Sequence, residues 1–403
     1  MSTPPSSLSL RRAREEDWPG IFSLDARSFA LPSTLPEAER AEFQAKVERA
    51  YVVHDRDALV ATSLHHLLPL TVPGGAVLPA AGLSWVSVAA THRRRGVLRR
   101  MMAQQFADWR GLPLAALTAS EGGIYERFGF GPACFADRVT IDPGAVIWRT
   151  EAPADSAVRY GTPEQIAARV PDLHDRWART RPGALGRPDS WWPSILADRD
   201  FRRDSQISGL HHLLHDDGYA AYRLDAHAMS ATVEELVAVT DRAHTDLWRV
   251  LTGLDLVRSI TAVLPTDDPL PAGLRNARAV TVTGRTDELW ISILDVPEAL
   301  ARRTYDVDGV LALSVTDDWS DRAGTYLLTV TDGLAEVRRT EADADGVPAV
   351  GLGISELSSL YCGGVRARML AAAGRIAVDA PGTLDLLDAL FTTRRAPFSG
   401  TFF

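Results

Sequence analysis

The sequence is poor in the residues that stabilise small secreted domains or bind metal clusters. Its 403 residues include only two cysteines, Cys134 and Cys362, too few and too far apart for a disulfide framework or a cysteine-based metal site. No apolar run reaches the length of a transmembrane helix, and the N-terminal segment lacks the apolar core of a secretory signal. We therefore expect a protein of the reducing cytoplasm, without a membrane span and without a metal.

Positive charge is also scarce. Lys46 is the only lysine, and 43 basic residues stand against 52 acidic ones, which gives a formal net charge of −9. Nucleic acids and anionic membranes bind positively charged surfaces, so the composition argues against both as partners. A cationic partner fits the charge of the chain better.

The rest of the composition is that of a globular protein with more than one core. With 46% hydrophobic and 24% charged residues, the chain is long enough for two or three domains. Between Leu8 and Trp109 the apolar pattern changes its period repeatedly, as the alternating helices and strands of an α/β or α+β domain do. The pattern predicts a helix over 17–29 and a hairpin around the turn at 73–75.

The next segment predicts a strand, a turn, a helix, a second strand and a second helix. Residues 82–88 alternate as a strand does, and apolar residues recur at helical spacing from Gly96 until Gly111 ends the helix. A short buried strand is expected at 114–118, followed by a helix around 124–128.

The most informative local motif lies between the first strand and the first helix of this segment, at 93–98, Arg-Arg-Arg-Gly-Val-Leu. Backbone N–H groups at a helix start bind anions, Gly96 permits the close approach of a pyrophosphate, and arginines neutralise its charge. On this hexamer alone, a solvated basic turn that opens a helix explains the residues equally well.

A second unit repeats this arrangement. Residues 237–242 resemble 88–93 at a constant offset, and apolar residues at helical spacing follow in both copies. At that offset Thr245 takes the place of Gly96, which disfavours close approach of a phosphate in the second copy. From residue 279 onward, strand-like segments precede three helices, expected around 354–360, 365–373 and 383–390.

A tyrosine follows the strand beside the basic motif. Tyr125 belongs to the segment 119–132, Ala-Ser-Glu-Gly-Gly-Ile-Tyr-Glu-Arg-Phe-Gly-Phe-Gly-Pro. A phenol with an ordinary pKa of about 10 is protonated at neutral pH and can donate its proton to a leaving group. The alternative is a packing tyrosine whose hydroxyl finds a hydrogen-bond partner.

These motifs resemble the Eis (enhanced intracellular survival) branch of the GNAT superfamily of N-acetyltransferases. The acyl-CoA loop of GNAT proteins follows the pattern Arg/Gln-x-x-Gly-x-Gly/Ala, from which Leu98 departs at the last position. The longer segment 92–99, His-Arg-Arg-Arg-Gly-Val-Leu-Arg, is nevertheless similar to the Eis branch. So are the tyrosine segment and the chain ending at 396–403, Ala-Pro-Phe-Ser-Gly-Thr-Phe-Phe.

The resemblance covers essentially the whole chain and implies its fold and domains. It implies an α+β protein with tandem GNAT-type domains followed by a sterol-carrier-protein-like domain. The first domain, 1–150, would hold acetyl-CoA, and the second, 151–285, would be a copy without the CoA motif. The third domain, 286–403, would deliver the C-terminal carboxylate to the active site of the first.

The resemblance also implies roles for individual residues. Tyr125 is the expected general acid, and the terminal carboxylate of Phe403 is the expected general base, whose pKa burial would raise. Asp25 and Trp85 are expected to present an acid and an aromatic ring to a cationic acceptor. Acetyl-CoA is expected against Val86, Ser87, Val88, Arg94, Arg95, Gly96, Val97, Leu98, Arg99, Ser120 and Glu121. From the residues alone, a frayed C-terminus and a helix-surface Asp25 remain alternatives.

The expected function is direct, acetyl-CoA-dependent transfer of an acetyl group to amines of cationic acceptors such as aminoglycosides or polyamines. Two alternatives stay open. One is a non-enzymatic acyl-CoA or lipid-binding protein, and the other is an enzyme that acetylates protein or peptide amines. The resemblance further implies a homo-oligomer, a ring of six chains.

Overall fold

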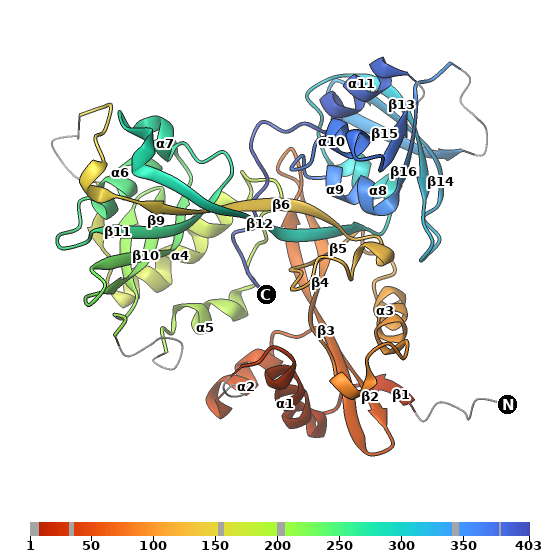
Figure 1. The fold of residues 1–403 in the computed structure, drawn as a ribbon, viewed down its shortest axis with the longest axis horizontal. Coiled ribbons are helices and arrows are strands. Elements are labelled where there is room, and N and C mark those ends of the chain that lie inside the picture. Colours follow the sequence, from red (N-terminus) through yellow and green to blue (C-terminus); the bar gives the residue numbers. More distant parts are fainter. Residues whose placement is uncertain (1–7, 32–35, 152–156, 200–205, 341–345, 379) are drawn as a thin grey trace.

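Within the described residues, the first of which is Leu8, twelve strands up to Ile293 form one continuous sheet (Figure 1). The computed structural model describes residues 8–31, 36–151, 157–199, 206–340, 346–378 and 380–403. Along the sheet the strand order is β1-β2-β3-β4-β5-β12-β6-β11-β10-β9-β8-β7. The first unit contributes β1 (Leu8–Arg12), β2 (Arg49–Asp55), β3 (Ala58–Thr71), β4 (Val77–Val88), β5 (Leu114–Leu117) and β6 (Gly131–Ile141). The second contributes β7 (Arg159–Tyr160), β8 (His211–His215), β9 (Gly218–Asp225), β10 (Ser230–Ala238), β11 (Ser259–Pro265) and β12 (Val280–Ile293).

The two units exchange their last strands. Strand β12 of the second unit lies between β5 and β6 of the first, and β6 in turn lies between β12 and β11. Ile141 at the end of β6, for example, is paired with Ile260 of β11 on one side and with Val280 of β12 on the other. The units therefore cannot separate without breaking the hydrogen bonds of the shared sheet.

Helices cover this sheet. They are α1 (Trp18–Ser28), α2 (Glu37–Gln44) and α3 (Val97–Asp108) in the first unit, and α4 (Pro163–Ala178), α5 (Trp192–Leu196), α6 (Asp241–Thr252) and α7 (Leu270–Gly273) in the second. The expected helix at 17–29 and the hairpin around 73–75 are confirmed by α1 and by the antiparallel pair β3 and β4. The helix expected around 124–128 is a single 3-10 turn, Glu126–Phe128. Gly129 ends it with a φ of +86°.

The second copy of the strand–helix segment differs from the expected alignment. In the first copy, eight residues separate β4 from α3; they include the 3-10 turn Ala90–His92, and the last of them, Gly96, is the N-cap. In the second copy, α6 begins at Asp241, only two residues after β10. The second copy thus has a connection of two residues where the first has eight. Thr245 therefore lies inside α6 and does not take the place of Gly96.

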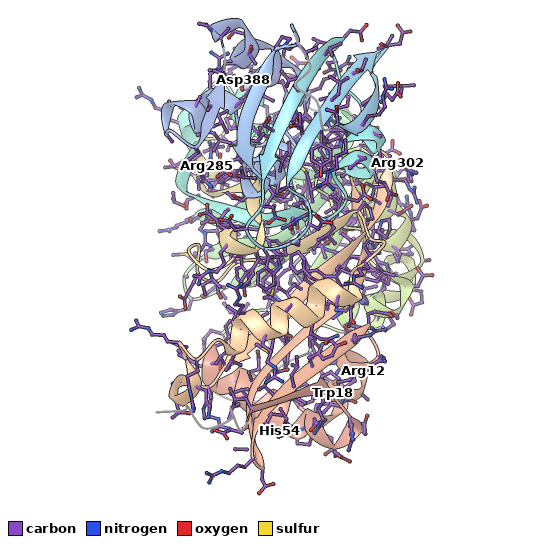
Figure 2. The ribbon with its side chains drawn as sticks, turned by 90° about the vertical axis from the view of Figure 1, so that its right-hand side faces the viewer. Arg12, Trp18, His54, Arg285, Arg302 and Asp388 are labelled. Atoms are coloured by element: carbon purple, nitrogen blue, oxygen red, sulfur yellow. The ribbon has the colours of Figure 1, made fainter. Side chains whose placement is uncertain are left out.

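The third unit has its own five-stranded sheet, in the order β15-β14-β13-β16-β17. Figure 2 shows it at one end, with Asp388, and the first unit at the other, with His54. Its elements are α8 (Val296–Arg302), β13 (Gly309–Thr316), β14 (Gly324–Thr331), β15 (Leu334–Thr340), β16 (Ala349–Gly353), α9 (Ile354–Leu360), α10 (Ala367–Ala372), β17 (Ile376–Val378) and α11 (Pro381–Phe391). The three helices expected near the C-terminus are thus present. One large apolar core joins this unit to β4, β5 and β12.

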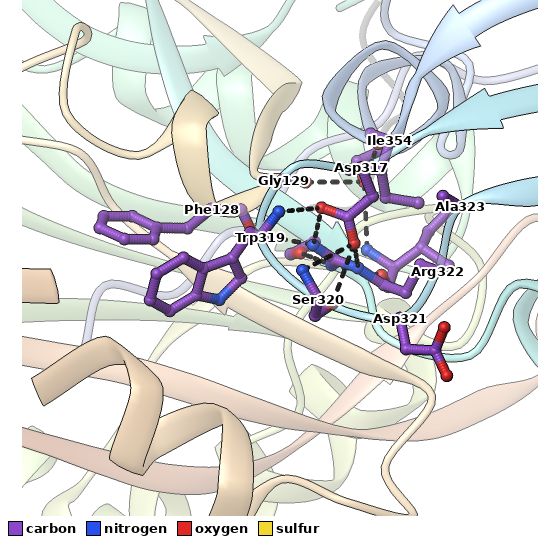
Figure 3. A network of polar contacts seen from close by, with 12 residues as sticks. Phe128, Gly129, Asp317, Trp319, Ser320, Asp321, Arg322, Ala323 and Ile354 are labelled. Atoms are coloured by element: carbon purple, nitrogen blue, oxygen red, sulfur yellow. Dashed lines mark hydrogen bonds and ion pairs between the residues drawn. The ribbon is translucent and has the colours of Figure 1, made fainter. Parts of the chain in front are cut away.

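A buried ion pair fastens the third unit to the first (Figure 3). Asp317 and Arg322 follow β13, their charged groups are 2.8 Å apart, and their side chains are only 1% and 5% exposed. The same guanidinium donates to Ser292 Oγ and to the carbonyl oxygens of Ile293 and Phe128. Arg322 therefore links the third unit to β12 and to the turn after Tyr125.

Replacing Arg322 with alanine should destabilise the protein by about 3–5 kcal/mol, because Asp317 would remain buried without its partner. Urea unfolding followed by circular dichroism measures the loss. Arg338→Ala in the same unit is the matched control, since Arg338 pairs with Glu336 while both side chains are more than half exposed. It should cost less than about 1 kcal/mol. Equal losses in the two variants would contradict the assigned role of Arg322.

Candidate active site

The first candidate cavity lies where two neighbouring strands separate. Strands β4 and β5 run parallel and pair only from Ala80 to Gly82, so the rest of β4 diverges from β5. A bulge in β4 increases the separation: its register against β3 shifts between Ser84 and Ser87, and Trp85 takes a φ of +50°. A cavity of about 520 Å³ opens at this point. The diverging strand leaves main-chain groups of β4 available to an extended ligand.

The start of helix α3 forms one wall of this cavity. Gly96 caps the helix with a φ of +76°, and no side chain occupies the cap, so the N–H groups of the first turn remain free for an anion. A Cβ at Gly96 would meet no atom within 4 Å, so crowding does not require a glycine at this position. The positive φ of Gly96 favours glycine instead. Arg93, Arg94 and Arg99 also line the cavity and add positive charge. This wall fits a pyrophosphate.

Tyr125 closes the inner end of the same cavity. It follows β5 and precedes the 3-10 turn, and its side chain is only 8% exposed. Burial, aided by the charge of Glu121, raises the pKa of Tyr125 to about 12. The phenol is therefore protonated at neutral pH, and its hydroxyl makes no hydrogen bond to any residue that the structure describes, so it is free to donate its proton.

The expected coenzyme residues mostly gather here. Those that line the cavity are Val86, Ser87, Val88, Arg94, Gly96, Val97, Leu98, Arg99, Ser120 and Glu121. Arg95 does not line it, and its guanidinium lies 3.9 Å from Asp55, which also contacts His92. The sequence did not point to Asp318 and Trp319 of the third unit, although both line the cavity.

The C-terminus lies between the three units near the middle of the molecule (Figure 1). Glu288 of β12 accepts hydrogen bonds from the main-chain N–H groups of Ser399 (2.9 Å) and Gly400 (3.2 Å). Arg187 donates to the carbonyl oxygen of Gly400 at 2.9 Å. Ser84 Oγ then donates to a carboxylate oxygen of Phe403 at 3.1 Å. The last residues are thus docked and not frayed.

A second cavity, of about 1000 Å³, contains the end of this tail. Strands β10 and β11 form one of its walls, because they pair in parallel only from Ser230 to Val233 and then separate, as β4 and β5 do. Phe43, Lys46 and His66 of the first unit form another wall, together with Phe403. The gap between β10 and β11 of the second unit is therefore part of the cavity that holds the C-terminus.

The two cavities approach each other at the bulge of β4. Ser84, which binds the terminal carboxylate, and Val86, which lines the cavity of Tyr125, lie two residues apart. The terminal carboxylate, which can accept a proton, and the Tyr125 phenol, which can donate one, thus approach β4 from two different cavities.

Asp25 and Trp85 lie beside the bulge and line neither of the two cavities. Asp25 is 5% exposed and accepts a hydrogen bond from Ser87 Oγ at 3.4 Å. Burial raises the pKa of Asp25 to about 6, and the bond from Ser87 opposes the rise. The Trp85 ring lies 4.3 Å from that of Phe43, whose side chain does line the larger cavity.

Within the described residues, no cluster of three or more His, Cys, Asp or Glu side chains is arranged to bind a metal ion. No described helix is long and apolar enough to cross a membrane.

Comparisons with known proteins agree with this division of the chain. An acetyltransferase (GNAT) domain family matches residues 9–133, a second GNAT domain family matches 183–291, and a sterol carrier protein domain family matches 296–400. The N-acetyltransferase Eis of Mycobacterium tuberculosis is 40% identical over 96% of this chain and 97% of its own. An uncharacterized N-acetyltransferase of Streptomyces avermitilis is 35% identical over 98% of both chains.

A solved structure gives the same result. The crystal structure of Eis1 from Mycobacterium abscessus superposes with a TM-score of 0.85 at 31% identity, and covers 98% of this chain and all of that one. Two GNAT domains and a sterol-carrier-type domain therefore make up the fold, as the sequence predicted. The chain belongs to the Eis family of GNAT N-acetyltransferases.

Proposed function

We propose that this N-acetyltransferase moves an acetyl group from acetyl-CoA to an amine of a cationic small molecule, such as an aminoglycoside or a polyamine. One observation carries the proposal: the terminal carboxylate and Tyr125 approach the same bulged strand from two cavities. One cavity suits a coenzyme and the other a bulky acceptor. Family membership already makes the chain an enzyme, which argues against the non-enzymatic alternative.

The smaller cavity fits acetyl-CoA, which supplies a thioester as the acetyl donor. Three features support the fit: free N–H groups at the start of α3, the lining arginines, and the unpaired edge of β4. In this proposal the helix start and Arg94 hold the pyrophosphate, and Val86 to Val88 hold the pantetheine arm by main-chain hydrogen bonds.

The proton transfers follow from the two docked groups. The carboxylate of Phe403 accepts the proton that the amine must lose, directly or through a water, and Tyr125 donates its proton to the departing thiolate. The amine attacks the thioester carbonyl directly, so no covalent enzyme intermediate forms. Ser84 fixes the carboxylate, and the contacts of Glu288 and Arg187 fix the tail that carries it.

The acceptor class rests on the larger cavity. Its volume of about 1000 Å³ suits a multi-ring or long-chain amine. Six acidic side chains and the terminal carboxylate line it against five basic side chains, those of Lys46, Arg181, Arg187, Arg223 and Arg395, so its net charge is negative and favours a cation. These acidic residues are Glu234, Glu235, Asp241, Asp267, Asp268 and Glu288. Peptide and protein amines remain the competing acceptors. By the same family resemblance, we propose a cytoplasmic homo-oligomer of six chains.

Tyr125→Phe should lower kcat by about 100-fold while CoA binding stays unchanged, because only the proton donor is lost. Thiol release from acetyl-CoA, measured with a panel of aminoglycosides, polyamines and peptide amines, gives the rates. Calorimetry gives the affinity for CoA. Tyr160→Phe, a change of an exposed tyrosine that lines neither cavity, is the matched control. Full activity of the Tyr125 variant would refute its role as the acid.

One glycine added after Phe403 should reduce turnover by about 100-fold without weakening CoA binding, because it displaces the carboxylate from Ser84. The same residue added before Met1 provides the control. Steady-state thiol release and calorimetry with CoA measure the two quantities. An extended enzyme with normal kcat would exclude the terminal carboxylate as the base.

The raised pKa of Asp25 predicts a pH dependence in the range from about 4 to about 6. Below pH 4 the carboxyl is neutral in both states, whereas above it the unfolded chain ionises first, so the contribution of Asp25 to the stability of the fold should fall as pH rises towards 6. Asp25→Asn abolishes this ionisation and should gain thermal stability over wild type at pH 7.5 but not at pH 4. Melting curves at both pH values test this. If Asp25 attracts the acceptor, KM for the amine should also fall as pH rises through 6 in wild type only.

A further inference from the structure

A loop of the third unit lies at the mouth of the smaller cavity. Asp318 and Trp319, which follow β13, line this cavity together with Arg99 of α3 and Tyr125. The loop comes from the sterol-carrier-type unit, whereas the other walls come from the first unit. The third unit thus contributes side chains to the proposed coenzyme site.

The indole of Trp319 is held between aromatic and basic side chains. Its ring meets that of Phe128 edge to face at 4.7 Å and that of Phe106 at 5.8 Å. The Arg99 guanidinium lies 5.3 Å from the ring centroid, a cation–π contact. Trp319 is only half-buried by these neighbours, so part of its surface remains open at the cavity.

The loop is rigid enough to present this ring in one position (Figure 3). Asp317 accepts hydrogen bonds from the main-chain N–H groups of Trp319 (2.9 Å) and Ser320 (3.2 Å). The buried pair of Asp317 and Arg322 anchors the loop to the carbonyl oxygen of Phe128. A ring fixed before binding loses little conformational entropy when it contacts a ligand.

The position of Trp319 indicates which part of the coenzyme it would contact. Tyr125 is buried and marks the inner, thioester end, and Gly96 marks the pyrophosphate. Arg99, Arg127 and Asp318, like Gly96 and unlike Tyr125, are exposed and mark the outer rim. The part of acetyl-CoA beyond the pyrophosphate is the adenosine, whose base is a flat aromatic ring that stacks on indoles.

We propose that the third unit completes the coenzyme site, and that Trp319 stacks on the adenine of acetyl-CoA while Arg99, beside it, pairs with a phosphate. This inference rests on the proposed coenzyme site. It assigns the sterol-carrier-type unit a direct part in binding the donor, in addition to carrying the C-terminal tail.

Calorimetry with CoA and with 4′-phosphopantetheine, which keeps the arm and one phosphate but lacks adenosine, tests the proposal. Trp319→Ala should weaken CoA binding by about 10-fold and leave the affinity for 4′-phosphopantetheine unchanged. Trp319→Phe should restore most of the affinity for CoA. Asp321→Asn, in the same loop, should leave it unchanged within about 2-fold, because the Asp321 side chain is fully exposed and does not line the cavity.

Three outcomes would overturn the inference: an unchanged CoA affinity in Trp319→Ala, an equal loss for both ligands, or no effect of Trp319→Ala once Arg99 is already alanine. The last would mean that Trp319 merely orders Arg99. If wild-type protein bound no CoA, the proposed coenzyme site itself would be refuted. If wild-type protein bound CoA and the Trp319→Ala variant bound it equally well, only the role of Trp319 would be refuted.

Discussion

The pairing of β6 with β12 is the constraint on which the rest of the structure depends. Each of these strands lies between strands of the other unit, so the two acetyltransferase-type units share one rigid sheet. Strand β12 also carries Glu288, which binds the C-terminal tail, and ends with Ser292 and Ile293, which bind Arg322. One strand therefore fixes the second unit, the third unit and the tail relative to the cavity of Tyr125.

The sequence was most informative where function depends on consecutive residues. The strand–loop–helix segment around Gly96 and the position of Tyr125 after β5 could be predicted because a short stretch of chain determines each. The second copy was predicted less well. The alignment at a constant offset assumed that the loop between strand and helix has the same length in both copies. Only two residues separate β10 from α6, so Thr245 lies inside the helix. Periodicity identifies a helix, but it locates the start of the helix poorly.

The docking of the tail could not be derived from the residues alone, because most of its bonds involve main-chain atoms. Phe398 N–H donates to the carbonyl oxygen of Pro182, and Leu185 N–H donates to that of Ser399. Such contacts leave no residue pattern, and Glu288 and Arg187 lie more than 100 positions before the groups that they bind. Gly400 fits the docked tail, since its φ is +62° and a Cβ there would lie 2.4 Å from the Trp177 ring.

Both acetyltransferase-type units have an opening between two parallel strands that separate, β4 and β5 in the first and β10 and β11 in the second. The two openings differ in the charge and capping of the helix that follows. In the first copy the opening leads to an uncapped helix start beside arginines, which suits a phosphate. In the second, the Thr240 side chain caps α6 by accepting a bond from Ala243 N–H, and Asp241 adds negative charge. An anion is thereby disfavoured at the start of α6, and the opening merges with the cavity of Phe403. Under the proposed function, duplication supplied one opening for the donor and one for a cationic acceptor, and the shared sheet holds both at a fixed separation.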